Sequence, residues 1–210
     1  MEYSLNYWDY QKKIGEFGGR ANFYKFKNFV KESDQILDFG CGGGYLLENF
    51  NCKIKHGLEI NDVAREFAES KGLKIFKSLN EISENYYDLI ISNHALEHCE
   101  RPLDELKTLY NKLKPGGRII FYVPNDSIIH NYDPLNPNQH LYTWNAQCLG
   151  NLFNHAGFKI ISCKKYVHRW PPKYRFIEKV FGPIIFDFCS RVYGLLSIFT
   201  LCQVRIICKK

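Results

Sequence analysis

The hydrophobic and polar positions of this chain follow two patterns that alternate along the sequence. Short apolar runs bounded by turn residues predict strands, and segments with apolar residues at helical spacing predict helices. The predicted strands are 36–37, 53–58, 73–76, 88–92, 118–123, 158–162 and 202–208, and the predicted helices are 61–71, 103–112 and 145–155. Most strands are therefore followed by a helix or a loop before the next strand begins.

A glycine cluster, Gly40-Cys41-Gly42-Gly43-Gly44, follows the first predicted strand. Glycines adopt backbone angles closed to other residues and leave no side chain between the main chain and a ligand. The pattern predicts a strand, a tight loop and a helix over 45–50, whose free N–H groups and positive dipole end would face the loop. Such a loop suits a carboxylate or a phosphate, so it does not choose the ligand alone.

The spacing of the glycines and acids narrows the choice of ligand. A dinucleotide-binding loop needs a glycine at its sixth position, and Tyr45 stands there. Asp38, two residues before Gly40, is placed to accept hydrogen bonds from an ammonium group. Glu59 ends the second strand and is placed to accept from ribose hydroxyls. An amino-acid end together with a ribose describes S-adenosylmethionine.

Three segments, in order, resemble the class I S-adenosylmethionine-dependent methyltransferases. Residues 37–44 (LDFGCGGG) are similar to motif I of that family, 87–98 to its fourth strand and following loop, and 113–120 to its fifth strand with its lead-in. The resemblance covers roughly residues 30 to 165. It implies an α/β, Rossmann-like fold: a seven-stranded, mostly parallel sheet with an antiparallel last strand and helices on both faces.

The same resemblance implies which residues would bind S-adenosylmethionine. Those around the glycine loop and the two strands beside it are Asp38, Gly40, Cys41, Gly42, Glu59 and Ile60. Asn93 and His94 follow the fourth strand, and Ser78 and Leu79 would lie near the adenine. Many related enzymes have an acid near the last two positions to meet the adenine amino group. Here a serine hydroxyl or main-chain groups would have to make that contact.

Residues 1–31 are dense in aromatic side chains and precede the first strand. They are expected to form one or two short helices broken at Gly18-Gly19. In similar enzymes such a leader closes over the cofactor, and Arg20 could then meet the cofactor carboxylate. The alternative is that the rings simply pack onto the domain.

The acceptor is expected beyond the carboxyl ends of the strands, at the loops that follow the fourth and fifth strands. A histidine with a pKa near neutral is a suitable general base for a hydroxyl acceptor. His98 and His140 are the candidates, with structural hydrogen bonds as the alternative role. Together with Glu97 and His94 they gather titratable groups on the predicted acceptor side.

The motif His94-x-x-Glu97-His98, with His140 from elsewhere, resembles the metal site of the small-RNA 2′-O-methyltransferases, with histidine in place of their first glutamate. Two imidazoles and a carboxylate suit a divalent transition ion. The Leu-Glu-His tripeptide is also common in class I methyltransferases with no known metal. The motif therefore fits both a metal site and a methyltransferase without a metal.

The 210 residues are expected to form a single methyltransferase domain. Its parts would be the aromatic cap 1–31, a core from 32–169 and 201–210, and a helical insertion over 170–200. The insertion is apolar but contains Asp187 and Arg191, and it has no uncharged apolar run long enough for a membrane-spanning helix. It would be a lid over the substrate pocket, a homodimer face or a surface that rests on a membrane.

Composition predicts a cytoplasmic protein. The eight cysteines include no Cys-x-x-Cys pair and indicate reduced thiols, and the amino end lacks the order of a secretory signal. The net charge of +6 comes with scattered lysines, which favours a solvated basic surface over nucleic-acid binding.

The sequence thus predicts O-methylation of a small polar acceptor such as a sugar or glycan precursor. This acceptor class rests on 138–144 (NQHLYTW) and the later Ala156-Gly157-Phe158, which resemble bacterial methyltransferases of surface-glycan and secondary-metabolite pathways. One alternative is a non-catalytic scaffold or activating subunit that still binds the cofactor. A nicotinamide-dependent dehydrogenase is disfavoured by Tyr45, and an RNA methyltransferase by the scattered lysines.

Overall fold

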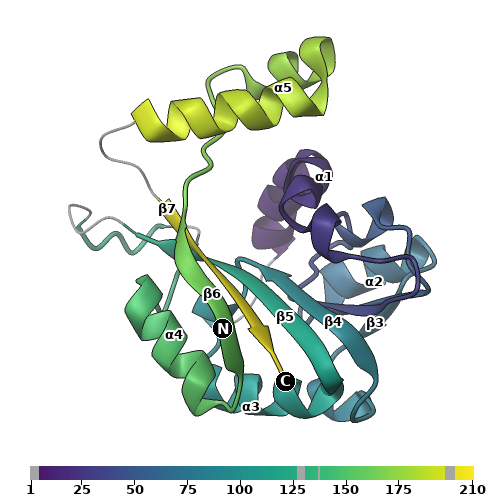
Figure 1. Ribbon diagram of the computed structural model, residues 1–210. Helices are drawn as coiled ribbons and strands as arrows, with labels where there is room; N and C mark the ends of the chain where they lie inside the picture. The colour runs from purple at the N-terminus through teal and green to yellow at the C-terminus, as the bar shows by residue number, and fades with distance from the viewer. Residues whose placement is uncertain (1–4, 127–130, 137, 197–201) are drawn as a thin grey trace.

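The computed structural model describes residues 5–126, 131–136, 138–196 and 202–210 (Figure 1). Their strands form a seven-stranded sheet in the order β3-β2-β1-β4-β5-β7-β6. The strands run parallel from β3 to β5, and β7 is antiparallel to both β5 and β6. They are β1 Gln35–Phe39, β2 Ile54–Leu58, β3 Lys74–Phe76, β4 Tyr87–Asn93, β5 Leu113–Asn125, β6 Lys159–Tyr166 and β7 Cys202–Lys209. This arrangement confirms the predicted fold.

Helices lie between the strands and at the start of the chain. They are α1 Leu5–Phe26, α2 Asp62–Ser70, α3 Pro102–Lys112, α4 Ala146–His155 and α5 Tyr174–Leu196, with 3-10 turns η1 Lys27–Phe29, η2 Leu47–Asn49, η3 Leu79–Glu81 and η4 Leu96–His98. Two of the helices begin at asparagine caps: Asn61 accepts from the N–H of Val63, and Asn145 from that of Cys148. The predicted helices 61–71, 103–112 and 145–155 are thus confirmed to within a residue or so.

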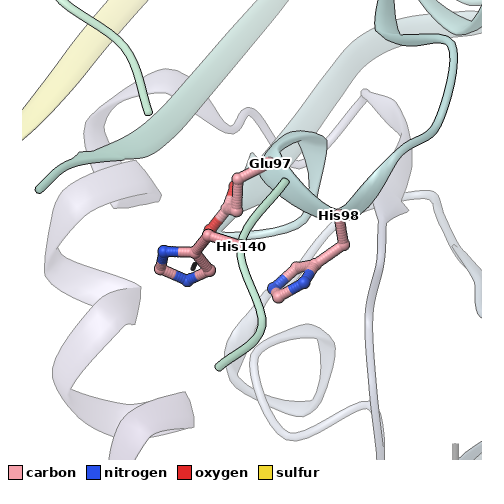
Figure 2. A group of neighbouring side chains, drawn as sticks. All are labelled: Glu97, His98 and His140. Carbon is pink, nitrogen blue, oxygen red and sulfur yellow. Dashed lines mark ion pairs between the residues drawn. The ribbon is translucent and has the colours of Figure 1, made fainter. Parts of the chain in front are cut away.

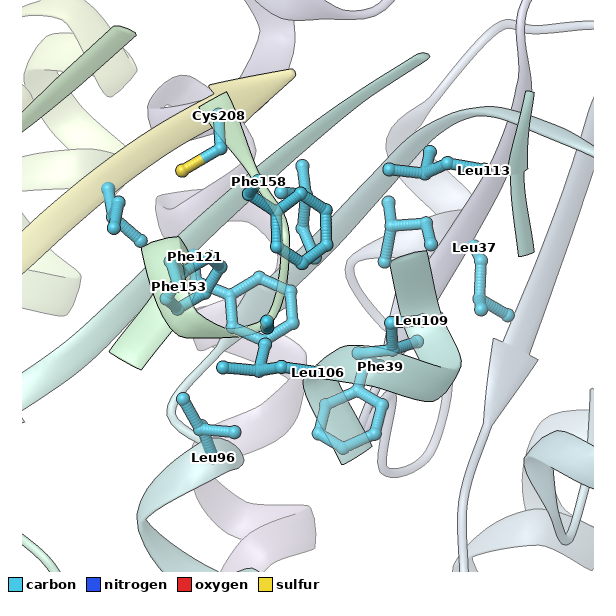
Figure 3. Packing of buried hydrophobic residues seen from close by; sticks show 14 of the residues in the cluster. Leu37, Phe39, Leu96, Leu106, Leu109, Leu113, Phe121, Phe153, Phe158 and Cys208 are labelled. Atoms are coloured by element: carbon cyan, nitrogen blue, oxygen red, sulfur yellow. The ribbon is translucent and has the colours of Figure 1, made fainter. Parts of the chain in front are cut away.

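Helices cover both faces of the sheet, because successive strand residues point to opposite sides. In β5, Phe121 packs with α3 and α4, whereas the next residue, Tyr122, packs with Phe26 of α1. Figure 3 shows the first of these clusters, in which Phe121 and Phe158 pack around Phe153 with ring centroids 5.6 and 5.5 Å from it. The two layers leave the carboxyl ends of the parallel strands available for a site.

The amino-terminal helix differs from the expectation of short helices broken at Gly18-Gly19. α1 is continuous from Leu5 to Phe26, so that prediction is wrong. A Cβ on Gly19 would lie 2.5 Å from the carbonyl oxygen of Tyr45. The glycine is therefore needed for close approach of α1 to the loop after β1, rather than for a break in the helix.

The helix predicted over 45–50 is also wrong, because only the 3-10 turn η2 forms there. Gly44 has φ +73°, so a right-handed helix cannot begin before Tyr45. Phe50 is already extended, with ψ 137°, as the chain turns toward β2. Too few residues remain for an α-helix, so the glycine loop is not followed by the N-terminus of an α-helix.

Within the segment 170–200, α5 occupies Tyr174–Leu196 and residues 170–173 are loop and turn; residues 197–201 fall outside the described ranges. α5 is kinked at Gly182, which precedes Pro183. Phe186 packs against Phe17 of α1 with ring centroids 5.3 Å apart. In Figure 1, α1 and α5 lie above the sheet, at the end where β7 begins. None of the helices in the described part of the chain is long and apolar enough to cross a membrane.

Candidate active site

A cavity of about 1070 Å³ lies at the carboxyl ends of β1, β2 and β4, with α1 along one side. Ligands of open α/β sheets bind at this end of the strands. The volume is at the upper end of the range for small-molecule sites. It therefore has room for a nucleoside-sized ligand and a small second molecule together.

Two carboxyl groups form one end of the cavity. Glu59 follows β2, and its two oxygens accept from the N–H groups of Gly42 and Asn61, both at 2.8 Å. Asp38 in β1 is buried, and this burial, together with the charge of Glu59, raises its pKa to about 8. Burial also raises the pKa of Glu59. A positively charged ligand here would favour the ionised form of both carboxyls, and their oxygens can accept hydrogen bonds from ligand hydroxyls.

Gly42 lets a ligand approach the main chain. Its φ is +52°, and a Cβ built on it would meet no atom within 4 Å. Since Gly42 lines the cavity, any side chain there would extend into the space for the ligand. Gly40 and Cys41, also predicted from the sequence, line the same wall, and Ile60 lies exposed at its edge.

Lys25 of α1 is a site residue that the sequence analysis missed. Its side chain is buried, lines the cavity and donates to Asn93 Oδ1 at 2.8 Å and to Gln203 Oε1 at 2.9 Å. Burial lowers the pKa of its amino group to about 7. The only sequence signal was a single lysine between the aromatic residues Tyr24 and Phe26.

Three predicted cofactor residues are not among those that line the cavity. Arg20 is mostly exposed, and its Nε lies 3.4 Å from Glu178 Oε1 of α5. Because α1 is continuous, Arg20 points away from the side on which Gly18 and Gly19 line the cavity. The Ser78 hydroxyl accepts from the N–H of Asn80, and Leu79 is buried in the core. The structure therefore does not bring these three side chains to the site.

Another part of the cavity lining carries the histidines of the two predicted loops. Glu97 and His98 belong to η4, which is separated from the end of β4 by two residues, and Glu97 is 0% exposed. The main-chain oxygen of Glu97 accepts from the N–H groups of Leu141 and Tyr142, at 3.0 and 3.3 Å. These hydrogen bonds fix the segment that holds His140 against η4. The predicted histidines are thus brought together (Figure 2).

The contacts within this cluster are specific. His140 Nδ1 lies 3.0 Å from Asp126 Oδ2, and His140 Nε2 lies 3.9 Å from Glu97 Oε1. His94 Nδ1 lies 3.3 Å from the same Glu97 oxygen. The rings of His98 and His140 are edge to face, with centroids 5.1 Å apart. The carboxylate of Glu97 is therefore surrounded by imidazoles.

The surroundings move the pKa values of the two candidate bases in opposite directions. Burial lowers the pKa of His98 and outweighs the charge of Glu97. Burial also disfavours the charged form of His140, but the Asp126 hydrogen bond and the charge of Glu97 outweigh it and raise the pKa. A pair of titratable groups separated in this way is suited to different proton-transfer roles.

Comparison with known proteins gives the family. Residues 15–163 match the family described as a methyltransferase domain. The ubiquinone biosynthesis O-methyltransferase of Shewanella sp. (strain ANA-3) is 30% identical over 106 residues, which are 45% of this chain and 45% of that protein. The match thus spans about half the length of this curated relative.

Solved structures show the same fold. An S-adenosylmethionine-dependent methyltransferase from Archaeoglobus fulgidus superposes with a TM-score of 0.71 at 22% identity, covering 97% of this chain and 99% of that one. A phosphoethanolamine N-methyltransferase 2 of Haemonchus contortus, solved with S-adenosylhomocysteine, superposes with a TM-score of 0.61 at 14% identity, covering 100% of this chain and 61% of that one. The family match over most of the chain, the strand order and the glycine loop agree: this chain belongs to the class I S-adenosylmethionine-dependent methyltransferases.

Proposed function

We propose that this enzyme transfers the methyl group of S-adenosylmethionine to a hydroxyl of a small acceptor that lies next to His98 and His140. The observation that carries the proposal is that these imidazoles line the same cavity as Asp38 and Glu59, with the buried carboxylate of Glu97 beside them. The methyl donor carries an electrophilic carbon on a positively charged sulfur. The protein therefore has to orient the acceptor, exclude water and remove the proton of the acceptor hydroxyl.

The donor would be held at the acidic end. Asp38 would accept from its ammonium group and Glu59 from its ribose hydroxyls, while the main chain at Gly42 would lie against it. We assign to Lys25 the role that the sequence gave to Arg20, because Lys25 lines the cavity beside Asn93; there it would bind the donor carboxylate. Asn93 and His94 follow at the end of β4 and line the space toward the acceptor.

His98 is the better candidate for the base. Its lowered pKa keeps the imidazole neutral near pH 7, so that it can take the hydroxyl proton. The acceptor oxygen then forms its bond to the methyl carbon as the carbon–sulfur bond breaks, and sulfur keeps the electron pair. His140, tied to Asp126, would hold the acceptor oxygen in position.

The acceptor itself is proposed as a small molecule. The name of the Shewanella relative supports O-methylation, whereas a sugar or glycan acceptor is supported only by the sequence resemblance. No nucleic acid is proposed as a partner, and the proposed location is the cytoplasm, which agrees with the free thiols of the described cysteines. The exposed apolar side chains of α5, among them Phe181, Ile184 and Phe188, are where a homodimer or a membrane surface would make contact.

The test is a methyl-transfer assay with labelled S-adenosylmethionine against separate pools of phenols, sugars and amines. We expect transfer to a hydroxyl, lost in His98→Ala with donor affinity retained. His155→Ala is the matched control, because His155 is exposed on α4 away from the cavity. Transfer to amines alone, or normal turnover in His98→Ala, would contradict the proposal.

A further inference from the structure

We propose that Glu97, His98 and His140 form a binding site for one divalent transition-metal cation at the acceptor end of the cavity. Each side chain offers one ligand atom, and all of these atoms lie within 4.8 Å of one another. Figure 2 shows the Glu97 carboxylate directed toward the His140 ring, with His98 beside it. Ligand atoms of a tetrahedral zinc site lie roughly 3.4 Å apart, given bonds of about 2.1 Å. Each pair of the three atoms would have to approach by at most about 1.4 Å to reach that spacing.

The strongest reason for a cation is the state of Glu97. The side chain is 0% exposed, and neither carboxylate oxygen makes a hydrogen bond to any residue that the structure describes. Its nearest basic atoms, His94 Nδ1 and His140 Nε2, are 3.3 and 3.9 Å away. A buried carboxylate without hydrogen bonds is costly unless it is paired or coordinates a metal. A cation between Glu97 and the two imidazoles would supply the missing partner.

His98 adds a second unpartnered atom. Its Nδ1 is buried and has no hydrogen-bond partner within the described ranges. A buried ring nitrogen is normally satisfied, so its state also calls for a ligand. Cys99 is not needed in the set, because its thiol already contacts the Ala95 carbonyl oxygen.

His140 is arranged as metal-binding histidines usually are. Its Nδ1 lies 3.0 Å from a carboxylate oxygen of Asp126, which leaves Nε2 on the side of Glu97. A carboxylate on the far nitrogen fixes the tautomer and the ring orientation and makes the imidazole a better ligand. Asp126 therefore acts as a positioning residue for this site.

The donor set favours a particular class of ion. Two nitrogens and one carboxylate suit zinc, manganese, cobalt or iron better than magnesium or calcium, which prefer oxygen ligands. Three protein ligands leave further coordination positions, and His98 and His140 line the cavity. The ion would therefore be open to an oxygen of the acceptor.

A role of the ion in methyl transfer deepens the proposed function and rests on it. Binding of the ion does not depend on the proposed function. A bound cation lowers the pKa of a coordinated hydroxyl. The proton would then leave to solvent, and the oxygen would form its bond to the methyl carbon as the carbon–sulfur bond breaks. His98 would be a ligand of the ion, and the acceptor would be a molecule that offers the ion an oxygen ligand.

The test is a titration of chelator-treated, tag-free protein with Mn²⁺, followed by the electron paramagnetic resonance signal of the free ion. Mn²⁺ is the probe because the eight cysteines could capture a thiol-seeking ion such as zinc. We expect one bound ion per chain. Glu97→Gln should abolish that binding, and Asp126→Asn should weaken it roughly 10- to 100-fold, as outer-shell changes do. His155→Ala should bind as the unaltered protein does.

The outcomes separate clearly. No saturable binding to the unaltered protein, or equal binding to Glu97→Gln, would overturn the inference. A melting curve of Glu97→Gln recorded without metal tests whether this variant folds. The second readout is the rise in melting temperature on addition of Mn²⁺, which Glu97→Gln should lose. O-methylation that persists in excess chelator would refute the catalytic role of the ion while sustaining the proposed function. Mn²⁺ binding at the three residues without any methyl transfer would sustain the ion site and refute the proposed function.

Discussion

Lys25 Nζ lies 2.8 Å from Asn93 Oδ1, so that a lysine of the amino-terminal helix is bonded to the last residue of β4. The same amino group bonds Gln203 at the start of β7, and the Tyr122 hydroxyl donates to the Lys25 main-chain oxygen. These contacts hold α1 over the carboxyl ends of the strands. They also hold the Lys25 amino group in the wall of the cavity that Asp38 lines.

Replacing Lys25 with methionine should therefore weaken binding of the donor through its carboxylate. A hydrogen bond to a charged group is worth roughly 1.5–3 kcal/mol, so S-adenosylhomocysteine should bind about 10- to 100-fold more weakly. Methylthioadenosine, which lacks the amino-acid end, should lose far less affinity. Isothermal titration calorimetry measures both ligands.

Arg20→Met is the matched control for that variant. It removes a basic side chain from the same helix, but one that faces Glu178 rather than the cavity, so donor affinity should stay unchanged. If Arg20→Met instead bound S-adenosylhomocysteine more weakly than Lys25→Met, the donor carboxylate would be assigned to Arg20, as the sequence predicted.

Gly42→Leu should abolish donor binding while leaving the protein folded. The added side chain meets no protein atom near its Cβ and extends into the cavity. Gly72→Leu is an equal perturbation away from the site, because Gly72 also has a positive φ and open space at the Cβ position. Both variants should lose similar stability in thermal unfolding, since both force a leucine into the left-handed region. If Gly42→Leu bound S-adenosylhomocysteine normally, the glycine loop would not be part of the donor site.

The sequence predicted the sheet and the acidic end of the cavity because those features depend on local patterns. Alternation of apolar runs fixes which residues face the two layers, and the spacing from Asp38 through the glycines to Glu59 lies within one strand–loop–strand unit. The convergence of His98 and His140 followed from the rule that strand ends meet at one edge of the sheet.

Lys25 and Arg20 show where such reasoning stops. Both are basic residues of one helix, and only the direction of that helix decides which of them reaches the cavity. That direction depends on whether Gly18-Gly19 breaks the helix, and the answer lies in the contact of Gly19 with Tyr45, which is distant in sequence. The same holds for Glu97, whose burial without a hydrogen-bond partner among the described residues no pattern in the sequence reveals.

If methyl transfer persists in excess chelator, the pH dependence of turnover should identify the base. A base must be neutral, so kcat/KM should fall as the pH drops through the pKa of His98, which lies below the ordinary value of 6.5. Asp126→Asn removes a group that raises the pKa of His140, so the His140 pKa measured by NMR should fall. The acid limb of kcat/KM should stay in place or rise slightly, because a less charged His140 depresses the His98 pKa less. If the acid limb of kcat/KM instead moved to lower pH together with the His140 pKa, the base would be His140.

Gly18→Ala and Gly19→Ala should change stability in opposite directions, although the two glycines are adjacent in α1. A Cβ on Gly18 would find its nearest atoms at 3.7 Å, an ordinary contact, so the gain in helix propensity of up to about 1 kcal/mol should raise Tm by roughly 2–4 °C. A Cβ on Gly19 would lie 2.5 Å from the Tyr45 carbonyl oxygen, and overpacking of this kind costs typically about 1–3 kcal/mol. Thermal unfolding should therefore place Gly19→Ala several degrees below Gly18→Ala. Because the displaced helix also carries Lys25, Gly19→Ala should weaken S-adenosylhomocysteine binding as well; equal Tm values for the two variants would mean that α1 does not rest on the loop at Tyr45.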